Sequence, residues 1–196
     1  MSADTEPILV VDDEATVREI VSESLDSAGY RCTTADCTMD ALQKLQKEPF
    51  SLALLDIRMP GASGMDLLRE IRITYPDTAV MMVTAVDDAA TAVEAMRLGA
   101  SVYIVKPLNL DGLLLSVQRA LETRRIILEN RDYQLRLREK IQEETRKARA
   151  LFLDSLVMIG KALESQNQCW QNHSERVSHV GAAVATELSL TEEMVE

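Results

Sequence analysis

The segment Leu52-Ala-Leu-Leu-Asp56 places four consecutive apolar residues directly before an acid. A short continuous apolar run is typical of a strand that is buried on both faces of a sheet. Similar runs recur before residue 107, and segments with helical spacing of apolar residues separate them. The predicted strands span residues 8–11, 30–34, 52–55, 79–83 and 101–105. Strands that alternate with helices predict an α/β fold with a doubly wound, five-stranded parallel sheet.

Amphipathic segments connect the predicted strands. In residues 14–28 apolar side chains recur on one helical face, and Gly29 follows where a helix end favours positive φ. Residues 63–66 (Ser-Gly-Met-Asp) have the pattern of a capping box that opens a third helix. Further helices are predicted around residues 41–45, over 87–98 and from Asn109 onward. Together with the strands they predict a first domain over residues 1–120.

The most reactive side chains follow the predicted strands at their carboxyl ends, where open α/β sheets bind ligands. They are Asp12, Asp13, Asp56, Thr84 and Lys106. Crowded carboxylates resist ionisation, and a divalent cation such as Mg²⁺ relieves their repulsion. An aspartate beside that cation is a competent nucleophile for a phosphoryl group, whose oxygens a lysine and a hydroxyl can bind. The set therefore predicts a magnesium-dependent aspartyl phosphate site at Asp56.

Each of these residues also has an ordinary structural interpretation. A single acid at a strand end is as often a helix cap or a solvated loop residue. Tyr103 fits a half-buried core position as well as a functional one. The functional interpretation depends on the complete set, because independent motifs at four strand ends reinforce one another.

Four stretches together resemble the receiver domain of two-component response regulators. They are residues 10–14 (VVDDE), 55–61 (LDIRMPG), 83–85 (VTA) and 103–107 (YIVKP). The resemblance covers residues 7–120 and implies the flavodoxin-like receiver fold, with a histidine kinase as phosphoryl donor. It implies that Asp13, Asp56 and the backbone carbonyl of Arg58 ligate Mg²⁺, while Asp12 acts largely through water.

The same resemblance implies a conformational switch. Thr84 is expected to move toward the phosphoryl group and Tyr103 to turn inward behind it, which changes the surface of the fourth helix, fifth strand and fifth helix. The Lys106–Pro107 peptide bond is expected to be cis. Val102 departs from the family pattern, which often has an acid there, but it lies outside the five phosphorylation-site residues.

Residues 121–153 predict a long, mostly solvated helix that continues the last helix of the first domain. No Pro or Gly interrupts the sequence between Gly112 and Gly160. Leucines recur every seven residues, at Leu114, Leu121, Leu128 and Leu135. The companion positions are Val117, Arg124, Arg131 and Arg138, which makes a coiled-coil seam weak. We expect this helix to pair with a partner or with a second copy in a homodimer.

Residues 154–196 predict a further helical fragment, with a last helix over about 173–188. The stretch His173-Ser-Glu-Arg-Val177, preceded by Glu164, resembles the start of HD-GYP domains, which hydrolyse cyclic di-GMP at a metal cluster. The resemblance implies metal ligation by His173, and Glu164 aligns with an acid that is a ligand in some members. Asn167 and Cys169 replace the Asp and Tyr that are common before the His.

The HD-GYP resemblance is incomplete. The chain holds no His-Asp and no Gly-Tyr-Pro motif, so the metal cluster cannot be completed within it. The ordinary interpretation of His173 and His179 is a surface or helix-terminal histidine. Residues 191–193 (Thr-Glu-Glu) look like a helix start close to the chain end, as expected for a truncated domain. This chain is therefore expected to regulate rather than to catalyse.

Composition narrows the remaining function classes. The 196 residues are 46% apolar and carry a net charge of −11, and residues 1–107 hold 18 acidic against 9 basic side chains. That balance disfavours nucleic-acid binding. No apolar run is long enough to span a membrane, and the polar N-terminus is no signal peptide, so a cytoplasmic protein is expected. Cys32, Cys37 and Cys169 lack zinc-site spacing and are expected to be buried free thiols.

The predicted function is a regulatory switch that transmits phosphorylation through the long helix to an output domain. In the parent protein that output is expected to be a cyclic di-GMP phosphodiesterase of HD-GYP type. The alternative is a scaffold that acts by dimerisation or by binding a protein partner, without enzymatic output. A DNA-binding output ranks third, since the sequence lacks a basic helix-turn-helix.

Overall fold

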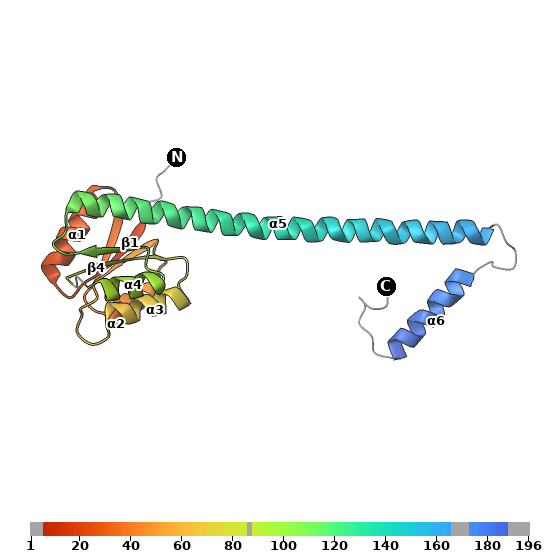
Figure 1. The fold of residues 1–196 in the computed structure, drawn as a ribbon, viewed down its shortest axis with the longest axis horizontal. Helices are drawn as coiled ribbons and strands as arrows, with labels where there is room; N and C mark the ends of the chain where they lie inside the picture. The colour runs from red at the N-terminus through yellow and green to blue at the C-terminus, as the bar shows by residue number, and fades with distance from the viewer. Residues whose placement is uncertain (1–5, 86–87, 166–172, 188–196) are drawn as a thin grey trace. The chain divides into compact units, whose positions relative to one another are not determined.

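The computed structural model describes residues 6–85, 88–165 and 173–187. Within them, strands and helices alternate in the order that the sequence predicts (Figure 1). The strands are β1 (Pro7–Val11), β2 (Arg31–Ala35), β3 (Leu52–Leu55), β4 (Ala79–Thr84) and β5 (Val102–Val105). The helices are α1 (Ala15–Ser27), α2 (Thr38–Lys47), α3 (Gly64–Thr74), α4 (Ala89–Arg97), α5 (Leu110–Ser165) and α6 (His173–Glu187).

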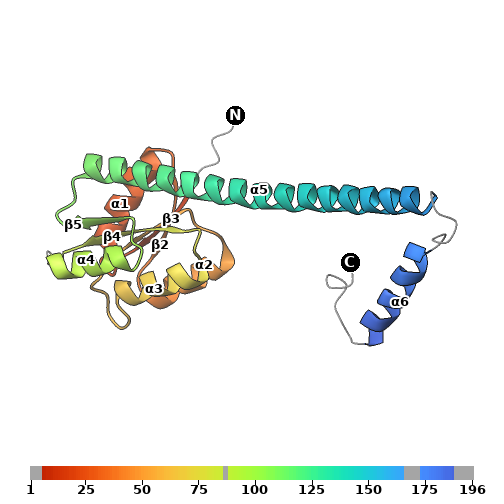
Figure 2. The ribbon, with the colours of Figure 1, turned by 45° about the vertical axis from the view of Figure 1, so that its right-hand side comes forward.

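The five strands form one parallel sheet in the order β2-β1-β3-β4-β5. Helices α1 and α5 cover one face, and α2, α3 and α4 cover the other (Figure 2). The strand order changes direction beside β1, which is the point where folds of this kind bind ligands. The predicted doubly wound five-stranded sheet is confirmed.

Alternate side chains of each strand enter two separate hydrophobic cores, because successive residues of a strand point to opposite faces. In β1, Leu9 and Val11 pack under α2, α3 and α4, whereas Ile8 and Val10 pack under α1 and α5. β3 and β4 are buried along their whole lengths. Burial on both faces explains why their sequences are uninterrupted apolar runs.

Predicted boundaries shift by one to three residues for local reasons. β2 begins at Arg31 rather than Tyr30, because the Tyr30 backbone N–H donates to the Leu25 carbonyl at 3.1 Å and closes the end of α1. Gly29 has a φ of 91° in that turn, as the sequence predicts. The capping box of Ser63 and Asp66 is confirmed. The fourth helix begins at Ala89 because the Asp88 side chain caps it.

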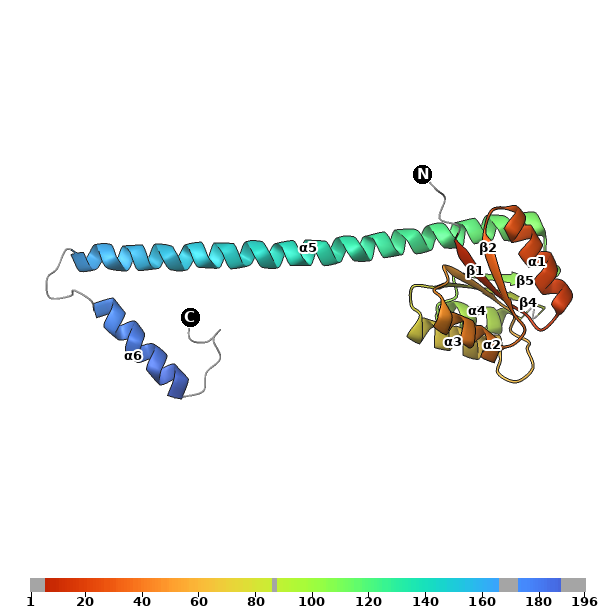
Figure 3. The same cartoon turned by 180° about the vertical axis from the view of Figure 1, so that it is seen from behind.

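Helix α5 runs unbroken over 56 residues, which confirms the predicted long helix. Its residues 129–152 are exposed. The chain divides into two compact units between Asp132 and Tyr133, inside this helix. The domain limits predicted at residues 120 and 153 also fall inside it and stay predictions. Figure 3 shows the same elements from the opposite side.

The predicted C-terminal motif falls mostly outside the described residues. Asn167, Cys169 and Thr191 lie outside them, and the side chains of Glu164 and His173 are likewise outside the description. Within α6, His179 is exposed, in keeping with its ordinary interpretation. Cys32 and Cys37 are free and half-buried. None of the helices in the described part of the chain combines the length and apolarity that a membrane crossing requires.

Candidate functional site

The parallel ladder extends past the strand ends and fixes the backbone of the predicted site. The Asp56 N–H donates to the Val11 carbonyl at 2.9 Å, which joins the ends of β3 and β1. The Lys106 N–H donates to the Thr84 carbonyl at 2.9 Å, which joins the ends of β5 and β4. These bonds hold the side chains after four strands at the same edge of the sheet.

Three carboxylates meet at that edge. One oxygen each from Asp12, Asp13 and Asp56 lies within 4.8 Å of the others. Asp12 is 3% exposed and Asp56 is 5% exposed, whereas Asp13 is exposed to solvent. The cluster therefore has two buried acids and one acid that is open to solvent. We call Asp12, Asp13, Asp56 and Lys106 the acidic pocket.

The Lys106 side chain supplies the positive charge of the acidic pocket. Its Nζ lies 2.7 Å from Asp12 Oδ2 and 3.3 Å from Asp56 Oδ2. Burial lowers the pKa of Lys106, but the hydrogen bonds and charges of Asp12 and Asp56 outweigh it and raise that pKa above its ordinary value. The lysine therefore stays protonated at neutral pH.

The acidic pocket carries more negative than positive charge. Among the described residues, Lys106 is the one cation that forms an ion pair within this cluster, and its partners there are the two buried acids, Asp12 and Asp56. Buried carboxylates without a full set of partners are costly. A hard divalent cation prefers carboxylate oxygens and brings two positive charges, so the donor set fits such an ion.

Two contacts that the sequence analysis missed hold the loop after β1. The Asp12 Oδ1 accepts from the Glu14 N–H at 3.0 Å, and the Asp12 carbonyl accepts from Arg18 Nη1 at 2.6 Å. Arg18 lies on α1, six residues after Asp12. An arginine five residues past the Asp12-Asp13 pair, in the first turn of the following helix, is the sequence signal for this contact. The two bonds fix both the side chain and the backbone of Asp12.

Gly64 packs against the backbone of Asp56. A Cβ atom at Gly64 would lie 1.9 Å from the Asp56 carbonyl oxygen, so only glycine fits. The Gly64 N–H donates to the Ile57 carbonyl at 3.1 Å, and the Arg58 N–H donates to Asp56 Oδ1 at 3.3 Å. The start of α3 therefore presses directly on the residue predicted to be phosphorylated.

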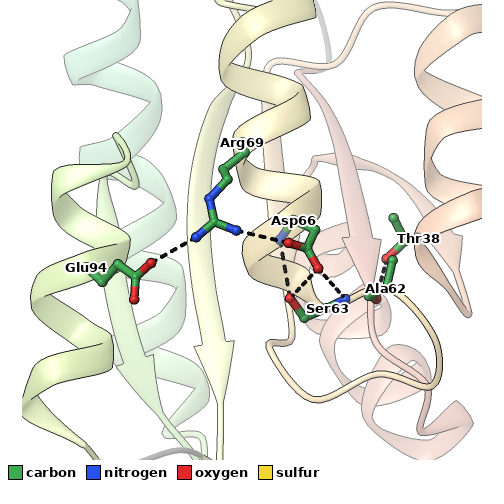
Figure 4. A network of polar contacts seen from close by, with 6 residues as sticks. All are labelled: Thr38, Ala62, Ser63, Asp66, Arg69 and Glu94. Atoms are coloured by element: carbon green, nitrogen blue, oxygen red, sulfur yellow. Dashed lines mark hydrogen bonds and ion pairs between the residues drawn. The ribbon is translucent and has the colours of Figure 1, made fainter.

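Polar contacts hold the loop between Asp56 and α3 (Figure 4). Thr38 Oγ1 on α2 donates to the Ala62 carbonyl at 2.9 Å. The Ser63 and Asp66 capping box follows, and Arg69 lies 2.9 Å from both Asp66 and Glu94. Because Glu94 belongs to α4, this network links α4 to the loop that leaves the acidic pocket.

The predicted switch residues occupy the expected strands. Thr84 ends β4 and is fully buried. Tyr103 lies in β5, is half-buried and packs against the core under α2, α3 and α4. The Lys106–Pro107 peptide bond is cis, as the resemblance implies. The movement of Thr84 and Tyr103 on phosphorylation stays a prediction.

Curated relatives match the receiver half of this chain. The C4-dicarboxylate transport transcriptional regulatory protein DctD of Pseudomonas aeruginosa is 40% identical over 133 residues, which cover 68% of this chain and 29% of DctD. The transcriptional regulatory protein ZraR of Klebsiella oxytoca is 39% identical over 126 residues, 64% of this chain and 28% of ZraR. The chain thus spans less than a third of the length of these relatives.

Solved structures match the same half. A CheY-like receiver domain protein from Methanospirillum hungatei is 30% identical with a TM-score of 0.60, covering 62% of this chain and 98% of that one. TrrA from Thermotoga maritima, in complex with Mg²⁺ and BeF, is 36% identical with a TM-score of 0.54, covering 59% and 98%. Residues 8–118 match the response regulator receiver domain family. That match covers more than half of the chain, so the chain belongs to the response regulator receiver domain family.

Proposed function

We propose that Asp56 accepts a phosphoryl group from a partner histidine kinase and that Mg²⁺ binds in the acidic pocket. One observation carries the proposal: three carboxylate oxygens converge within 4.8 Å, and among the described residues a single lysine pairs with two of the three acids, Asp12 and Asp56. A purely structural cluster would balance its charges, because uncompensated buried acids cost stability. The excess negative charge supports a site for a divalent cation and for the chemistry that it assists.

The residues of the acidic pocket have separate roles in metal binding and phosphoryl transfer. Asp13, Asp56 and the carbonyl of Arg58 would hold Mg²⁺, with Asp12 acting through water; the bound ion neutralises negative charge on the phosphoryl oxygens. A carboxylate oxygen of Asp56 attacks phosphorus, the phosphorus–nitrogen bond of the donor histidine breaks, and the imidazole leaves. Lys106 offsets the charge of the transferred group. The Mg²⁺ and BeF complex of TrrA, a 36% identical protein, supports the choice of metal.

The surface beside the acidic pocket suits the kinase partner. An apolar groove runs between α1 and the segment after β5, lined by Val17, Ile20, Pro107 and Leu110, and Lys106 lines it as well. Ile20 is 47% exposed there. A donor helix seated in this groove would hold its histidine next to Asp56. Ile20→Asp should slow phosphoryl transfer from the kinase by at least tenfold, while labelling by acetyl phosphate stays unchanged.

The primary test is phosphoryl uptake by the purified chain. With Mg²⁺ and acetyl phosphate, the wild type should shift on a phosphate-affinity gel, and Asp56→Asn should not. Asp40→Asn is the matched control, because Asp40 pairs with Lys44 at 2.5 Å outside the acidic pocket. Equal labelling of wild type and Asp56→Asn would reject Asp56 as the acceptor.

Transmission from the pocket uses Thr84, Tyr103 and α5. We propose that phosphorylation shifts the population of two states of the face formed by α4, β5 and α5. The bond of Arg69 to Glu94 supports this, since it ties α4 to the loop after Asp56. Helix α5 then carries the change toward an output, and we propose that it does so in a homodimer.

Three outputs are candidates for the parent protein. The Glu164 and His173 motif favours a cyclic di-GMP phosphodiesterase of HD-GYP type in the parent protein. The names of DctD and ZraR favour transcriptional regulation, although their matches span less than a third of those proteins. A scaffold without enzymatic output is the remaining alternative. Metal-loaded full-length gene product should hydrolyse cyclic di-GMP; specific DNA binding without hydrolysis would favour the transcriptional output instead.

A further inference from the structure

Beyond Asp132, helix α5 carries a long stripe of apolar side chains. The stripe consists of Leu137, Ile141, Thr145, Ala148, Phe152, Leu156, Ile159 and Leu163. Its members follow one another in steps of four, four and three residues, so the pattern repeats every eleven residues. Leu137, Ala148 and Ile159 occupy one position of the repeat, and Ile141, Phe152 and Leu163 occupy the next. Thr145 is the single polar member.

The stripe is exposed along its length. Its six large apolar side chains are between 44% and 65% exposed. At 1.5 Å per residue it extends over about 39 Å of helix. Between Arg136 and Lys147 the opposite side of the helix is charged, and it includes the Lys147 and Glu143 ion pair at 2.6 Å. Beyond Ala150 the helix also carries exposed apolar side chains off the stripe, among them Val157 and Met158. An exposed apolar stripe of this length, interrupted only by Thr145, marks a surface that binds a partner.

The stripe differs from the row of heptad leucines. Leu114 and Leu121 pack in the receiver core under α1 and α5, together with Val117. Continued by sevens, the leucine row reaches Gln142 and Arg149, which are polar. The first part of the leucine row therefore packs in the receiver core, Leu135 is exposed, and the row then continues into polar residues. The stripe is the apolar row that continues along the distal helix to Leu163.

We propose that this stripe pairs with the same stripe of a second copy, in a parallel and in-register helix pair. The inference rests on the proposed homodimer and names its interface. An eleven-residue repeat corresponds to 3.67 residues per turn, close to a straight helix, and gives a slight right-handed twist. A left-handed heptad coiled coil would instead bring Gln142 and Arg149 into the seam.

Charge complementarity favours a second copy in parallel. Successive residues turn by about 100°, which places Glu144 and Arg149 about 70° to either side of the stripe. They are five residues apart. Glu144 also lies 3.1 Å from Lys147 Nζ of its own helix. In a parallel pair, Glu144 of one copy then faces Arg149 of the other across the seam as a second cationic partner, and the symmetry repeats the contact. Ala148 meets its own copy between these pairs, where a small side chain permits close approach.

Disulfide formation between two copies tests whether the stripe or the leucine row forms the interface, and whether the two helices are parallel. In the full chain with Cys32, Cys37 and Cys169 replaced by Ala, single cysteines are introduced by Leu137→Cys, Ala148→Cys and Gln142→Cys. Mild oxidation should give covalent dimers with Leu137→Cys and Ala148→Cys, and at least tenfold less with Gln142→Cys. Stronger cross-linking through Gln142→Cys would overturn the stripe. Cross-linking at Ala148→Cys but not at Leu137→Cys would indicate antiparallel helices and overturn the proposed direction.

A second measurement separates this inference from the phosphorylation proposal. Phe152→Asp should weaken self-association at least tenfold by light scattering, whereas Arg146→Asp on the charged side should not. Both variants should still be labelled by acetyl phosphate as the wild type is. An Asp56→Asn chain should keep the cross-links of Ala148→Cys. A wild type that stays monomeric over the whole concentration range would overturn the pairing while leaving Asp56 labelling as evidence for the receiver.

Discussion

Two clusters of charged side chains lie at opposite ends of the receiver sheet. At the carboxyl ends of the strands, two of the three carboxylates of the acidic pocket, those of Asp12 and Asp56, are buried and share one lysine. Before the amino end of β4, Asp77 accepts from Arg131 Nη1 and Nη2 at 2.8 and 3.0 Å, and its carbonyl accepts from Arg124 Nε at 2.5 Å. We call this second cluster the Asp77 clamp.

The two clusters differ in burial and in charge balance. In the Asp77 clamp the side chains of Asp77 and Arg131 are each about half exposed, and the acid has a full cationic partner. Exposed, balanced ion pairs contribute little to stability. The acidic pocket has the opposite properties, because it concentrates unbalanced charge where water is scarce. The comparison indicates that a cluster of buried side chains with unbalanced charge is a candidate reactive site, whereas an exposed ion pair with balanced charge is a structural contact.

The largest loss of stability is expected from adding one methyl group at Gly64, beside the acidic pocket. Gly64→Ala should destabilise the receiver by roughly 3 kcal/mol, because its Cβ would meet the Asp56 carbonyl oxygen at 1.9 Å and displace the loop. Urea unfolding measures the loss. Gly112→Ala in α5 is the control, since its Cβ meets only Asn109 at 3.8 Å. Equal stability of Gly64→Ala and wild type would contradict the close packing.

Replacing Lys106 should strongly reduce the rate at which acetyl phosphate labels the protein. Lys106→Met should slow labelling by acetyl phosphate roughly 100-fold, because the charge on the transferred phosphoryl group loses its cationic partner. Initial rates on phosphate-affinity gels measure the change. Lys44→Met is the matched control, because Lys44 pairs with Asp40 outside the pocket. A rate within twofold of the wild type would remove Lys106 from the proposed site.

Magnesium should stabilise the charge-imbalanced cluster selectively. At ten times its Kd, Mg²⁺ should raise the free energy of unfolding by about 1.4 kcal/mol. Asp13→Asn should lose at least half of that increment at the same concentration, and Asp40→Asn should keep it. Thermal unfolding with and without the metal measures both. An undiminished increment in Asp13→Asn would place the ion elsewhere.

The Asp77 clamp should give the smallest effect. Asp77→Ala should lower the free energy of unfolding by less than about 1 kcal/mol, because solvent screens this half-exposed pair. Hydrogen bonds from Arg131 hold the pKa of Asp77 below its usual 3.8. A lowered folded pKa contributes stability above the unfolded pKa that disappears as the pH falls through the folded pKa.

The pH dependence of that small effect tests the clamp. The difference between wild type and Asp77→Ala should be constant near neutrality, shrink as the pH falls below 3.8 and vanish below the lowered pKa. Urea unfolding across this range measures it, with Glu139→Ala as an exposed acid elsewhere on α5. A difference that grows on acidification would contradict the sign expected for a stabilised carboxylate.

Local pattern was enough to predict most of the receiver. The apolar run before Asp56 marks a strand because burial on both faces permits only apolar side chains. The capping box at Ser63 is equally local, since both of its partners lie within one helical turn. The need for glycine at position 64 could not be predicted from the sequence, because it arises from the Asp56 carbonyl oxygen, which lies against Gly64 only in the folded chain.

The sequence by itself determined the alternation of strands and helices, the residues at the strand ends and the continuity of α5, because periodicity and chain order encode them. Tertiary structure decided which charges meet. Arg124 and Arg131 look like failed seam positions in the sequence, yet they bind Asp77 across separations of 47 and 54 residues. Tertiary packing also places Leu114 and Leu121 in the receiver core, whereas the large apolar side chains of the stripe from Leu137 to Leu163 stay exposed on the distal helix. The physical reason is that helical spacing tells which side chains share a face, but only packing tells what that face contacts.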